Sequence, residues 1–578
     1  MTASAATAAD TRIFEGLPGV SDVRMLASGP VHLANTTPGE LRAALSALKD
    51  ERGFTHLSLL TAAELPLTPG EGDAPATPTG VKMVYEVTRR ADHAHAMLWV
   101  ELPEGSLEIP TICGLWSGAA PLEREVYDLF GVRFREHPNL RRLVLRDDFP
   151  GHPLRKGFVM KPTGVDDEDV AWALASYGDD GVPPQPESGD AATSIKLPYP
   201  FVADVLAQGG DADLRSERMM LHMGPQHPSM HGVLHLYLAV EGEKVLAAEV
   251  THGYLHRCIE KLAETRSYRA VTALVDRCDY VSGFFTELAL LSAAEQLAEI
   301  EVPAKAQWLR VLMCELCRIT SHDTWFAACG IDVGAFTPML FSFKQREAIL
   351  DFFEEVTGGR MMFNYFRPGG VKADLPAGSA ERLHEMLLGT HVVLDDLEAL
   401  ITNNEIFRNR TRGIGIIKPE MILDFGVTGP MARASGVNVD LRRDEPYAAY
   451  GEFDIPVPVG HAGDTFDRYA VRVAEMRHSI RLAIQVLEGM PEGDFVASGL
   501  PRALKPPAGA AYARVEGPRG ELGVYLESDG SANPWRMKVR TPAFSNLHVS
   551  PAVLPGSPIG DVIAITSSVD VVMGEIDR

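Results

Sequence analysis

Three polar residues of this chain stand in apolar surroundings punctuated by glycine: His231, Tyr280 and Asp332. A tyrosine offers an O–H donor, and a histidine, whose unperturbed pKa is about 6.5, donates once it is protonated. An aspartate beside an imidazole orients the ring and favours its charged form. For each residue alone a structural role is favoured, as a core histidine, a core tyrosine and an aspartate at a helix end, whereas the three together could make a site that transfers protons.

A site of this kind suits a quinone, because two donors can hold its two carbonyl oxygens and deliver two protons. The histidine lies in the stretch from His222 to His235, which holds four histidines. Pro225 and Pro228 break regular structure there, and the alternation over residues 232–240 predicts a strand. We therefore expect His231 at a loop-to-strand junction. The simpler alternative is a turn with incidental histidines.

The composition excludes several classes of function. The chain carries 54 basic and 78 acidic residues, a formal net charge of −24, so it is a poor candidate for binding nucleic acid. It has no dinucleotide fingerprint, P-loop, HExxH or GxSxG motif. No run approaches the roughly 18–20 apolar residues of a membrane helix, and residues 1–10 do not resemble a signal peptide. We expect contact with a membrane only through other proteins.

The six cysteines are few and irregularly spaced, which argues against a disulfide framework and fits a reducing compartment. Cys314 and Cys317 form the only CxxC pair, inside an apolar helical run. A zinc or iron–sulfur site needs about four ligands. We interpret the two as buried helix cysteines and expect no metal bound by this chain.

Residues 1–161 read as a small α+β domain. Helical spacing over 38–48 is followed by a predicted strand pair at 81–88 and 94–102. A polar block at 120–157 comes next, and its short helix carries three acidic residues: Glu123, Glu125 and Asp128. The block could be an active site. The favoured interpretation is a docking surface on which arginines form ion pairs with a partner.

Residues 162–205 are acidic and rich in proline and glycine, which is typical of a linker. Residues 206–578 then form a second domain that is mostly helical. Long helices are predicted at 303–329, 380–404 and 464–487 and favour a bundle, whereas the tail from 520 reads as strands and turns.

From Leu221 to Arg578 the chain resembles the D subunit of respiratory complex I, the proton-pumping NADH:quinone oxidoreductase. The motifs that carry this resemblance are Gly224-Pro-Gln-His-Pro-Ser-Met-His-Gly232, Gly253-Tyr-Leu-His-Arg-Cys-Ile-Glu-Lys261, Asp279-Tyr-Val281, Asp332-Val-Gly-Ala335, Tyr365-Phe-Arg-Pro-Gly-Gly-Val371, Gly429-Pro-Met-Ala-Arg-Ala-Ser-Gly436 and Gly574-Glu-Ile-Asp-Arg578. The C subunit is resembled at about 116–158, through Glu123-Arg-Glu-Val-Tyr-Asp-Leu-Phe-Gly131 and Asp147-Asp-Phe-Pro-Gly-His-Pro-Leu-Arg-Lys156. The chain thus looks like the fused C/D subunit of some bacteria.

The resemblance implies different roles for the two parts of the chain. Residues 206–578 would share the fold of the [NiFe]-hydrogenase large subunit, without its nickel cysteines and with β elements at both ends, and residues 1–161 would be a docking domain. The loop of His231 and the helix of Tyr280 would form the head of a quinone cavity, with Asp332 as partner of the histidine. Arg257, His256 and His227 would lie near the quinone or near a neighbour's [4Fe–4S] cluster.

Further implications concern the surroundings. This chain alone would bind no cofactor, because a B-type subunit would carry the terminal [4Fe–4S] cluster. I- and G-type subunits would complete the peripheral arm. An H-type membrane subunit would meet the quinone channel. The complex would lie on the cytoplasmic face of the bacterial inner membrane.

Two residues depart from the family's pattern. Cys258 stands where a glycine is usual, and Met362 where a histidine is frequent. Two alternatives therefore stay open: an equivalent subunit of a related complex fed by ferredoxin or a deazaflavin, and a scaffold without catalytic function.

Overall fold

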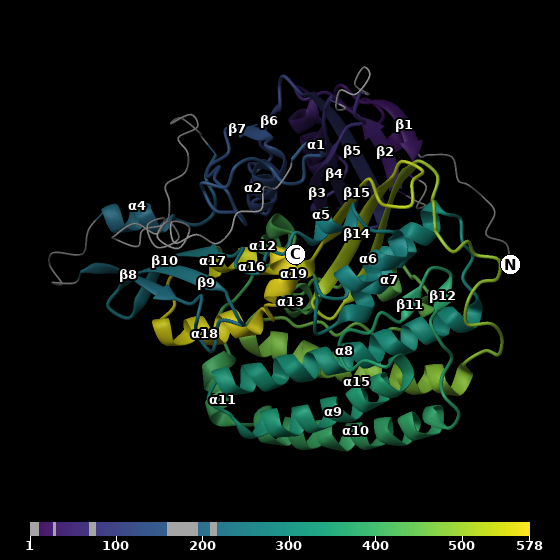
Figure 1. Cartoon of the computed structure of the whole chain (residues 1–578). Helices are drawn as coiled ribbons and strands as arrows, with labels where there is room; N and C mark the ends of the chain where they lie inside the picture. The colour runs from purple at the N-terminus through teal and green to yellow at the C-terminus, as the bar shows by residue number, and fades with distance from the viewer. Residues whose placement is uncertain (1–10, 27–30, 69–76, 159–194, 209–216) are drawn as a thin grey trace, which may run out of the picture.

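The structure is a computed structural model that describes residues 11–26, 31–68, 77–158, 195–208 and 217–578 (Figure 1). Most of the linker expected at 162–205 lies outside these residues. Its described end contains the start of helix α4 (Val202–Ala207), which packs on strands β9 and β10. The last part of the expected linker is therefore anchored on the second domain.

The N-terminal part is an α+β unit, as predicted. Its main sheet has the order β1-β2-β5-β4-β3, with β2 and β5 parallel and the other pairs antiparallel. Helix α1 packs on this sheet because its apolar residues recur three or four positions apart. The elements are η1 (Thr11–Ile13), β1 (Ser21–Met25), β2 (Val31–Asn35), α1 (Leu41–Asp50), β3 (His56–Glu64), β4 (Gly80–Arg89), β5 (Ala94–Pro103), β6 (Glu108–Pro110), α2 (Ala119–Phe130) and β7 (Arg133–Arg135).

The chain after residue 217 begins with an antiparallel sheet of order β10-β9-β8, formed by β8 (Arg218–Met223), β9 (His235–Glu241) and β10 (Lys244–Thr251). Strand β9 starts three residues later than the sequence pattern suggested, since residues 228–233 form a turn. His231 therefore lies inside the loop between β8 and β9 rather than at the edge of the strand.

A helical layer follows, and four long helices pack side by side in it: α8 (Ala304–Asp332), α9 (Thr337–Thr357), α10 (Ser379–Ile401) and α15 (Thr465–Gly489) (Figure 1). The predicted bundle is confirmed. The shorter elements are α5 (Ile259–Ala263), α6 (Tyr268–Val275), α7 (Gly283–Leu297), β11 (Phe366–Arg367), β12 (Gly370–Val371), α11 (Glu405–Thr411), α12 (Pro419–Phe425), α13 (Gly429–Ala434), α14 (Leu441–Asp444) and η2 (Tyr450–Glu452).

The C-terminal region corrects one prediction. An antiparallel meander of β13 (Gly509–Gly517), β14 (Gly520–Ser528) and β15 (Arg536–Arg540) confirms strands only up to residue 540. The rest is helical: α16 (Pro542–His548), α17 (Ser550–Val553), α18 (Ile559–Ser568) and α19 (Met573–Asp577). Helix α18 is rich in β-branched residues, whose intrinsic preference favours strands, so burial decided its conformation.

The meander joins the two parts of the chain. Ala510 and Tyr512 on β13 face the N-terminal sheet, whereas the alternate residues Ala511, Ala513 and Val515 face the helical layer. Because successive side chains of a strand point to opposite faces, one sheet serves both cores. No helix in the described ranges is long and apolar enough to cross a membrane.

Candidate functional site

The loop between β8 and β9 holds His231 in a fixed position. The Met230 N–H donates to His227 O at 3.1 Å, the Leu234 N–H donates to Met230 O at 3.1 Å, and Met230 is fully buried beneath the turn. His231 itself adopts a left-handed backbone conformation with φ 48°. A Cβ at Gly224 would overlap the carbonyl of Leu234. The two arms of the loop therefore meet only because glycine has no Cβ.

His231 lies next to two carboxylates. Its Nε2 atom is buried and has no hydrogen-bond partner among the described residues. Burial lowers the pKa of His231, while the charges of Asp332 and Asp570 act in the opposite direction. Asp332 is the last residue of α8, and Asp570 follows α18. The structure thus brings two of the three candidate residues together, beside a carboxylate that the sequence did not single out.

Tyr280 lies in the turn between α6 and α7, not within a helix as the resemblance implied. Its ring packs on Gly574, where a Cβ would come within 3.0 Å of Tyr280 Cε1. Burial raises the pKa of Tyr280, and the neighbouring Asp279 adds to the increase, while Arg519 and Arg257 oppose it. The phenol is half-buried, and because its pKa is raised it stays protonated and remains a donor at neutral pH.

Arg519 connects the surroundings of Tyr280 with those of His231. It is 1% exposed, donates to Asp279 and to Glu575 (2.6 Å), and lies 3.6 Å from Asp570. It also bonds Ser282 Oγ at 2.9 Å and Ser321 Oγ at 3.1 Å. We call Arg519 with Asp279, Asp570 and Glu575 the Arg519 network. Since Asp279 precedes Tyr280 and Asp570 lies near His231, these two candidate residues border the network, and Asp332 lies beside His231.

Sequence reasoning missed Arg519. It stands between Pro518 and Gly520 in the tight turn from β13 to β14, a pattern that predicts only a hairpin. A Cβ at Gly429 would overlap the carbonyl of Arg519, so the Gly429 motif and the hairpin are in close contact. The glycines of this motif indicate that another segment packs closely on it, but the sequence does not identify that segment.

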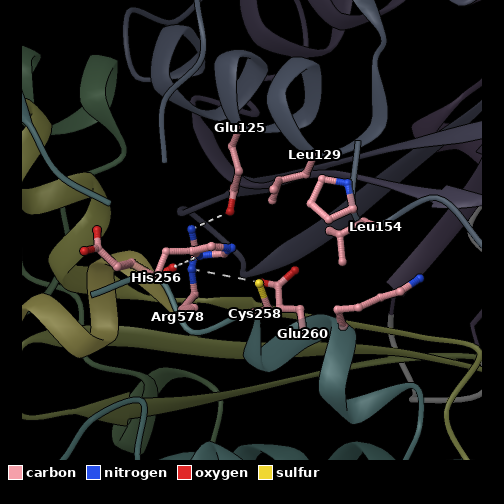
Figure 2. A pocket seen from close by; sticks show the side chains of 10 residues that line it. Glu125, Leu129, Leu154, His256, Cys258, Glu260 and Arg578 are labelled. Carbon is pink, nitrogen blue, oxygen red and sulfur yellow. Dashed lines mark hydrogen bonds and ion pairs between the residues drawn. The ribbon is translucent and has the colours of Figure 1, made fainter. Parts of the chain in front are cut away.

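The other candidate residues lie elsewhere. His227 accepts a hydrogen bond from Ser229 N at 3.2 Å and so stabilises its own turn. Arg257 is exposed, and its guanidinium donates to Arg277 O. His256 donates from Nδ1 to Asp577 O at 2.6 Å and lines a small pocket with Cys258, Arg578 and residues of α2 (Figure 2). Within the described residues, no hydrogen bond or ion pair joins any of the three to His231.

The acidic helix α2 docks on the same chain. Glu125 is 4% exposed and accepts from Lys538 Nζ at 2.6 Å and from the guanidinium of Arg578 (Figure 2). Asp128 accepts from the backbone N–H groups of residues 143–145 at 2.9–3.0 Å. The predicted docking surface thus finds partners within this polypeptide, on β15 and at the C-terminus.

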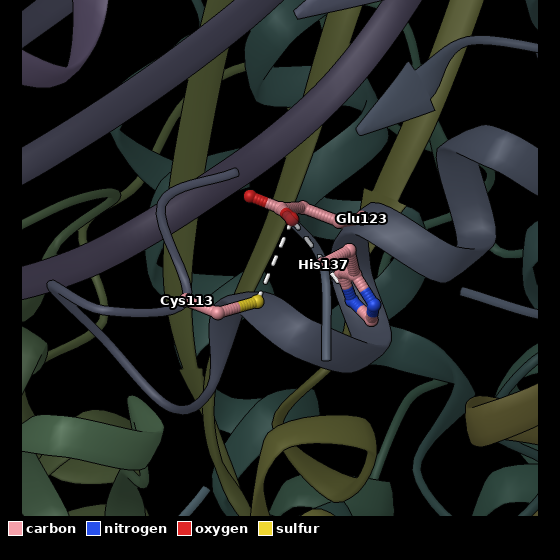
Figure 3. Close-up of side chains that lie close together, drawn as sticks. All are labelled: Cys113, Glu123 and His137. Carbon is pink, nitrogen blue, oxygen red and sulfur yellow. Dashed lines mark hydrogen bonds and ion pairs between the residues drawn. The ribbon is translucent and has the colours of Figure 1, made fainter. Parts of the chain in front are cut away.

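Cys113, Glu123 and His137 lie buried with possible ligand atoms within 4.8 Å of one another (Figure 3). Both imidazole nitrogens of His137 are engaged, since Nδ1 accepts from Asn139 N at 2.9 Å and Nε2 faces Ala120 O at 3.1 Å. Burial lowers the pKa of His137 to about 3 and raises that of Glu123 to about 7. The imidazole offers no free lone pair, so the cluster is a hydrogen-bonded one and a poor metal site.

The CxxC pair behaves as predicted. Cys314 and Cys317 are fully buried on α8, and all six cysteines are free. Burial raises the pKa of both thiols. They are packing residues rather than reactive thiolates.

Comparison with known proteins connects this geometry to a family. Residues 34–164 match the family described as "Respiratory-chain NADH dehydrogenase, 30 Kd subunit", and residues 332–503 and 499–578 match the "Respiratory-chain NADH dehydrogenase, 49 Kd subunit". The second match begins at Asp332, so His231 and Tyr280 precede it.

Individual relatives cover more of the chain. A C/D subunit of NADH-quinone oxidoreductase from Sulfurihydrogenibium sp. is 37% identical over 81% of this chain and 83% of its own length. A D subunit of NADH-quinone oxidoreductase from Symbiobacterium thermophilum and an H subunit of NAD(P)H-quinone oxidoreductase from Gloeobacter violaceus are each 44% identical over 63% of this chain and 99% of their own length. The chain belongs to the NADH-quinone oxidoreductase (respiratory complex I) family, as a fused C/D subunit whose partners are other subunits of that complex.

Proposed function

We propose that this subunit forms the quinone-reduction site of its complex at the edge of the Arg519 network. The observation that carries the proposal is that His231 and Tyr280, from distant parts of the sequence, border one buried network, with Asp332 beside His231. Buried groups with shifted pKa values, here His231 and Tyr280, gather at functional sites more often than elsewhere.

The reaction converts a quinone, two electrons and two protons into a quinol. Tyr280 donates one hydrogen bond to a carbonyl oxygen, and protonated His231 donates to the other. Asp332 and Asp570 favour the imidazolium form against the effect of burial. The electrons come from a [4Fe–4S] cluster of a neighbouring B-type subunit, so the chain is active only within the complex.

The assembly follows from the same proposal. Residues 1–161 dock the chain, 162–205 link it, and 206–578 carry the site on a core like the large subunit of [NiFe] hydrogenases. I- and G-type subunits complete the peripheral arm. An H-type membrane subunit meets the quinone channel of this proton-pumping complex, at the cytoplasmic face of the bacterial membrane.

NADH is the electron source we propose, because the C/D relative is named for it. The Gloeobacter relative is named for NAD(P)H, so the donor varies among similar chains. A ferredoxin or deazaflavin input is the alternative. Purifying the complex and identifying its input subunits decides between them.

Paired substitutions test the quinone site. We expect Tyr280→Phe and His231→Ala each to lower quinone reduction by about 10²–10⁴-fold, as loss of a positioned proton donor does, in complexes that still assemble. Tyr254→Phe and His222→Ala are matched controls, since both side chains are exposed nearby. Activity near the wild-type level in both site variants, with assembly intact, would favour the scaffold function instead.

Met362 provides a test of the neighbouring cluster. It is half-buried where the family often has histidine, the group expected to couple the cluster's potential to pH. We expect the potential of the terminal cluster to be nearly independent of pH. Redox titration followed by EPR at several pH values measures this, and a clear negative slope contradicts it.

A further inference from the structure

Asp276 and Glu287 form a buried carboxyl pair close to Tyr280 in the chain. Both are 0% exposed. Asp276 Oδ2 accepts from Asn364 N at 3.2 Å, and Glu287 Oε2 accepts from Tyr365 N at 3.1 Å and Phe366 N at 2.8 Å. Consecutive backbone N–H groups of one loop therefore hold both side chains. The second oxygen of each, Asp276 Oδ1 and Glu287 Oε1, is buried and has no hydrogen-bond partner in the described part of the chain.

No arginine or lysine among the described residues forms an ion pair with either carboxyl. Arg367, whose charge acts on Glu287, donates instead to Asn364 Oδ1 at 2.7 Å and Phe366 O at 3.0 Å. Arg277 is exposed and donates to Ala273 O at 2.6 Å. By contrast, Glu295, two turns further along α7, is bonded by Arg310 at 2.6 and 2.9 Å.

The remaining charged and titratable groups around the pair do not replace a cation. Asp279 is itself acidic and lies on the same turn as Asp276, and Cys317 of α8 is a buried thiol. Arg519 is committed to Asp279 and Glu575. Two carboxylates held by consecutive N–H groups of one loop, buried and without a paired cation, disfavour ionisation of both at once.

The protonation of the pair follows from this environment. Burial raises the pKa of Asp276 to about 7, and burial together with the charge of Asp276 raises the pKa of Glu287 well above its usual value. One proton on the pair removes one of its two buried negative charges.

The pair also closes the turn that presents Tyr280. This turn runs from Asp276, just after α6, to Gly283, the first residue of α7. A Cβ at Gly283 would overlap Asp276 Oδ1, so the carboxyl lies directly on the backbone at the far end of the turn. If the shared proton left, repulsion between Asp276 and Glu287 would push this carboxyl against a backbone that has no space to yield.

We propose that Asp276 and Glu287 share one proton at neutral pH and that this proton holds the turn that positions Tyr280. Both are positioning residues, since neither contacts the quinone in this scheme. The inference rests on the proposed role of Tyr280. It predicts that quinone reduction is lost at alkaline pH, when the shared proton dissociates.

Amide substitutions test the pair in the assembled complex. In Glu287→Gln, the amide oxygen can still accept from Tyr365 and Phe366, and the side chain keeps its size but carries no charge at any pH. Asp276→Asn is the reciprocal variant. For each we expect activity within about threefold of wild type at pH 7 and an alkaline limb of the pH–activity profile at least about one unit higher. Glu301→Gln, exposed beyond the end of α7, is the matched control.

An infrared readout keeps the inference separate from the proposed function. The wild-type complex should show a carbonyl stretching band of a buried protonated carboxyl that is missing in both amide variants and retained in the control. If the alkaline limb of both variants coincides with that of wild type, the positioning role is overturned. If the band is unchanged, the shared proton is overturned. Loss of the band together with full activity of Tyr280→Phe would leave the shared proton standing and remove the proposed quinone site.

Discussion

Two arginine-centred networks lie buried in the same half of the chain and differ in their surroundings. In the Arg519 network one guanidinium faces three carboxyls. In the second, which we call the Arg433 network, three guanidinium groups face four carboxyls, namely Arg318, Arg433 and Arg442 with Glu315, Asp440, Glu475 and Glu516.

The Arg433 network is enclosed. Tyr450 and Ser479 each donate to Glu315 at 2.6 Å, and every charged member is at most 2% exposed. The Arg519 network is bordered by the half-buried His231 and Tyr280. Buried charges that are paired and sealed define a structure, whereas a network short of positive charge and open at one edge can exchange protons. The Arg433 network therefore stabilises the fold, whereas the Arg519 network borders the candidate site.

The largest effect should come from removing the centre of the enclosed network. Arg433→Met leaves Glu475, Glu516 and Asp440 without their shared cation, and breaking a buried pair costs about 3–5 kcal/mol. We expect little assembled complex, measured as the amount of this subunit in membranes. The exposed Arg443→Met is the control and should change stability by less than about 0.5 kcal/mol. Normal accumulation of Arg433→Met would contradict an essential structural role.

The second prediction separates stability from activity. Lysine keeps the charge but loses the fork that bonds several groups at once. Arg519→Lys should lower quinone reduction per assembled complex by about tenfold or more, since Asp279 and Glu575 are no longer held together. Arg442→Lys should lower the amount of complex while its activity per complex stays unchanged. Equal specific activities of the two variants would remove the functional difference between the networks.

The third prediction concerns pH. Burial raises the pKa of Glu516 and of Glu575 to about 7. Because the folded state holds these protons more tightly, their stabilisation is complete below the unfolded value of about 4.3 and is lost as pH rises through about 7. Glu516→Gln and Glu575→Gln should each flatten the decline of thermal stability between pH 4 and 7.

Only Glu575→Gln should also change the pH profile of quinone reduction, because Glu575 bonds Arg519 and follows Gly574 beneath the ring of Tyr280. A change of the activity profile in Glu516→Gln would show that the enclosed network is coupled to the site after all.

The smallest effect is expected from Asp570→Asn. Asp570 and Asp332 both favour the charged form of His231, so loss of one carboxylate should lower the pKa of His231 further. We expect activity at pH 7 to fall about threefold, which corresponds to roughly half a pKa unit, and to recover at more acidic pH. Asp561→Asn, on α18 near Arg410, is the control. An unchanged profile would place Asp570 outside the site.

The local pattern of the sequence determined the long helices and the position of the candidate loop. Apolar spacing located α8, α10 and α15 to within a few residues, because the apolar face of a helix repeats every three or four residues along the chain. The prolines and glycines around His231 indicated a turn, and the burial of Cys314 and Cys317 followed from the apolar run that contains them.

Tertiary structure alone decided which charges meet. Arg519 and Asp279 are 240 residues apart in the chain, and an ion pair over that separation leaves no periodic trace in the sequence. The same holds for Glu125 and Arg578, which join helix α2 to the C-terminus across most of the chain. Helix α18 formed against its β-branched composition for a related reason, since packing between distant segments outweighs the fraction of a kcal/mol by which each residue prefers strand or helix.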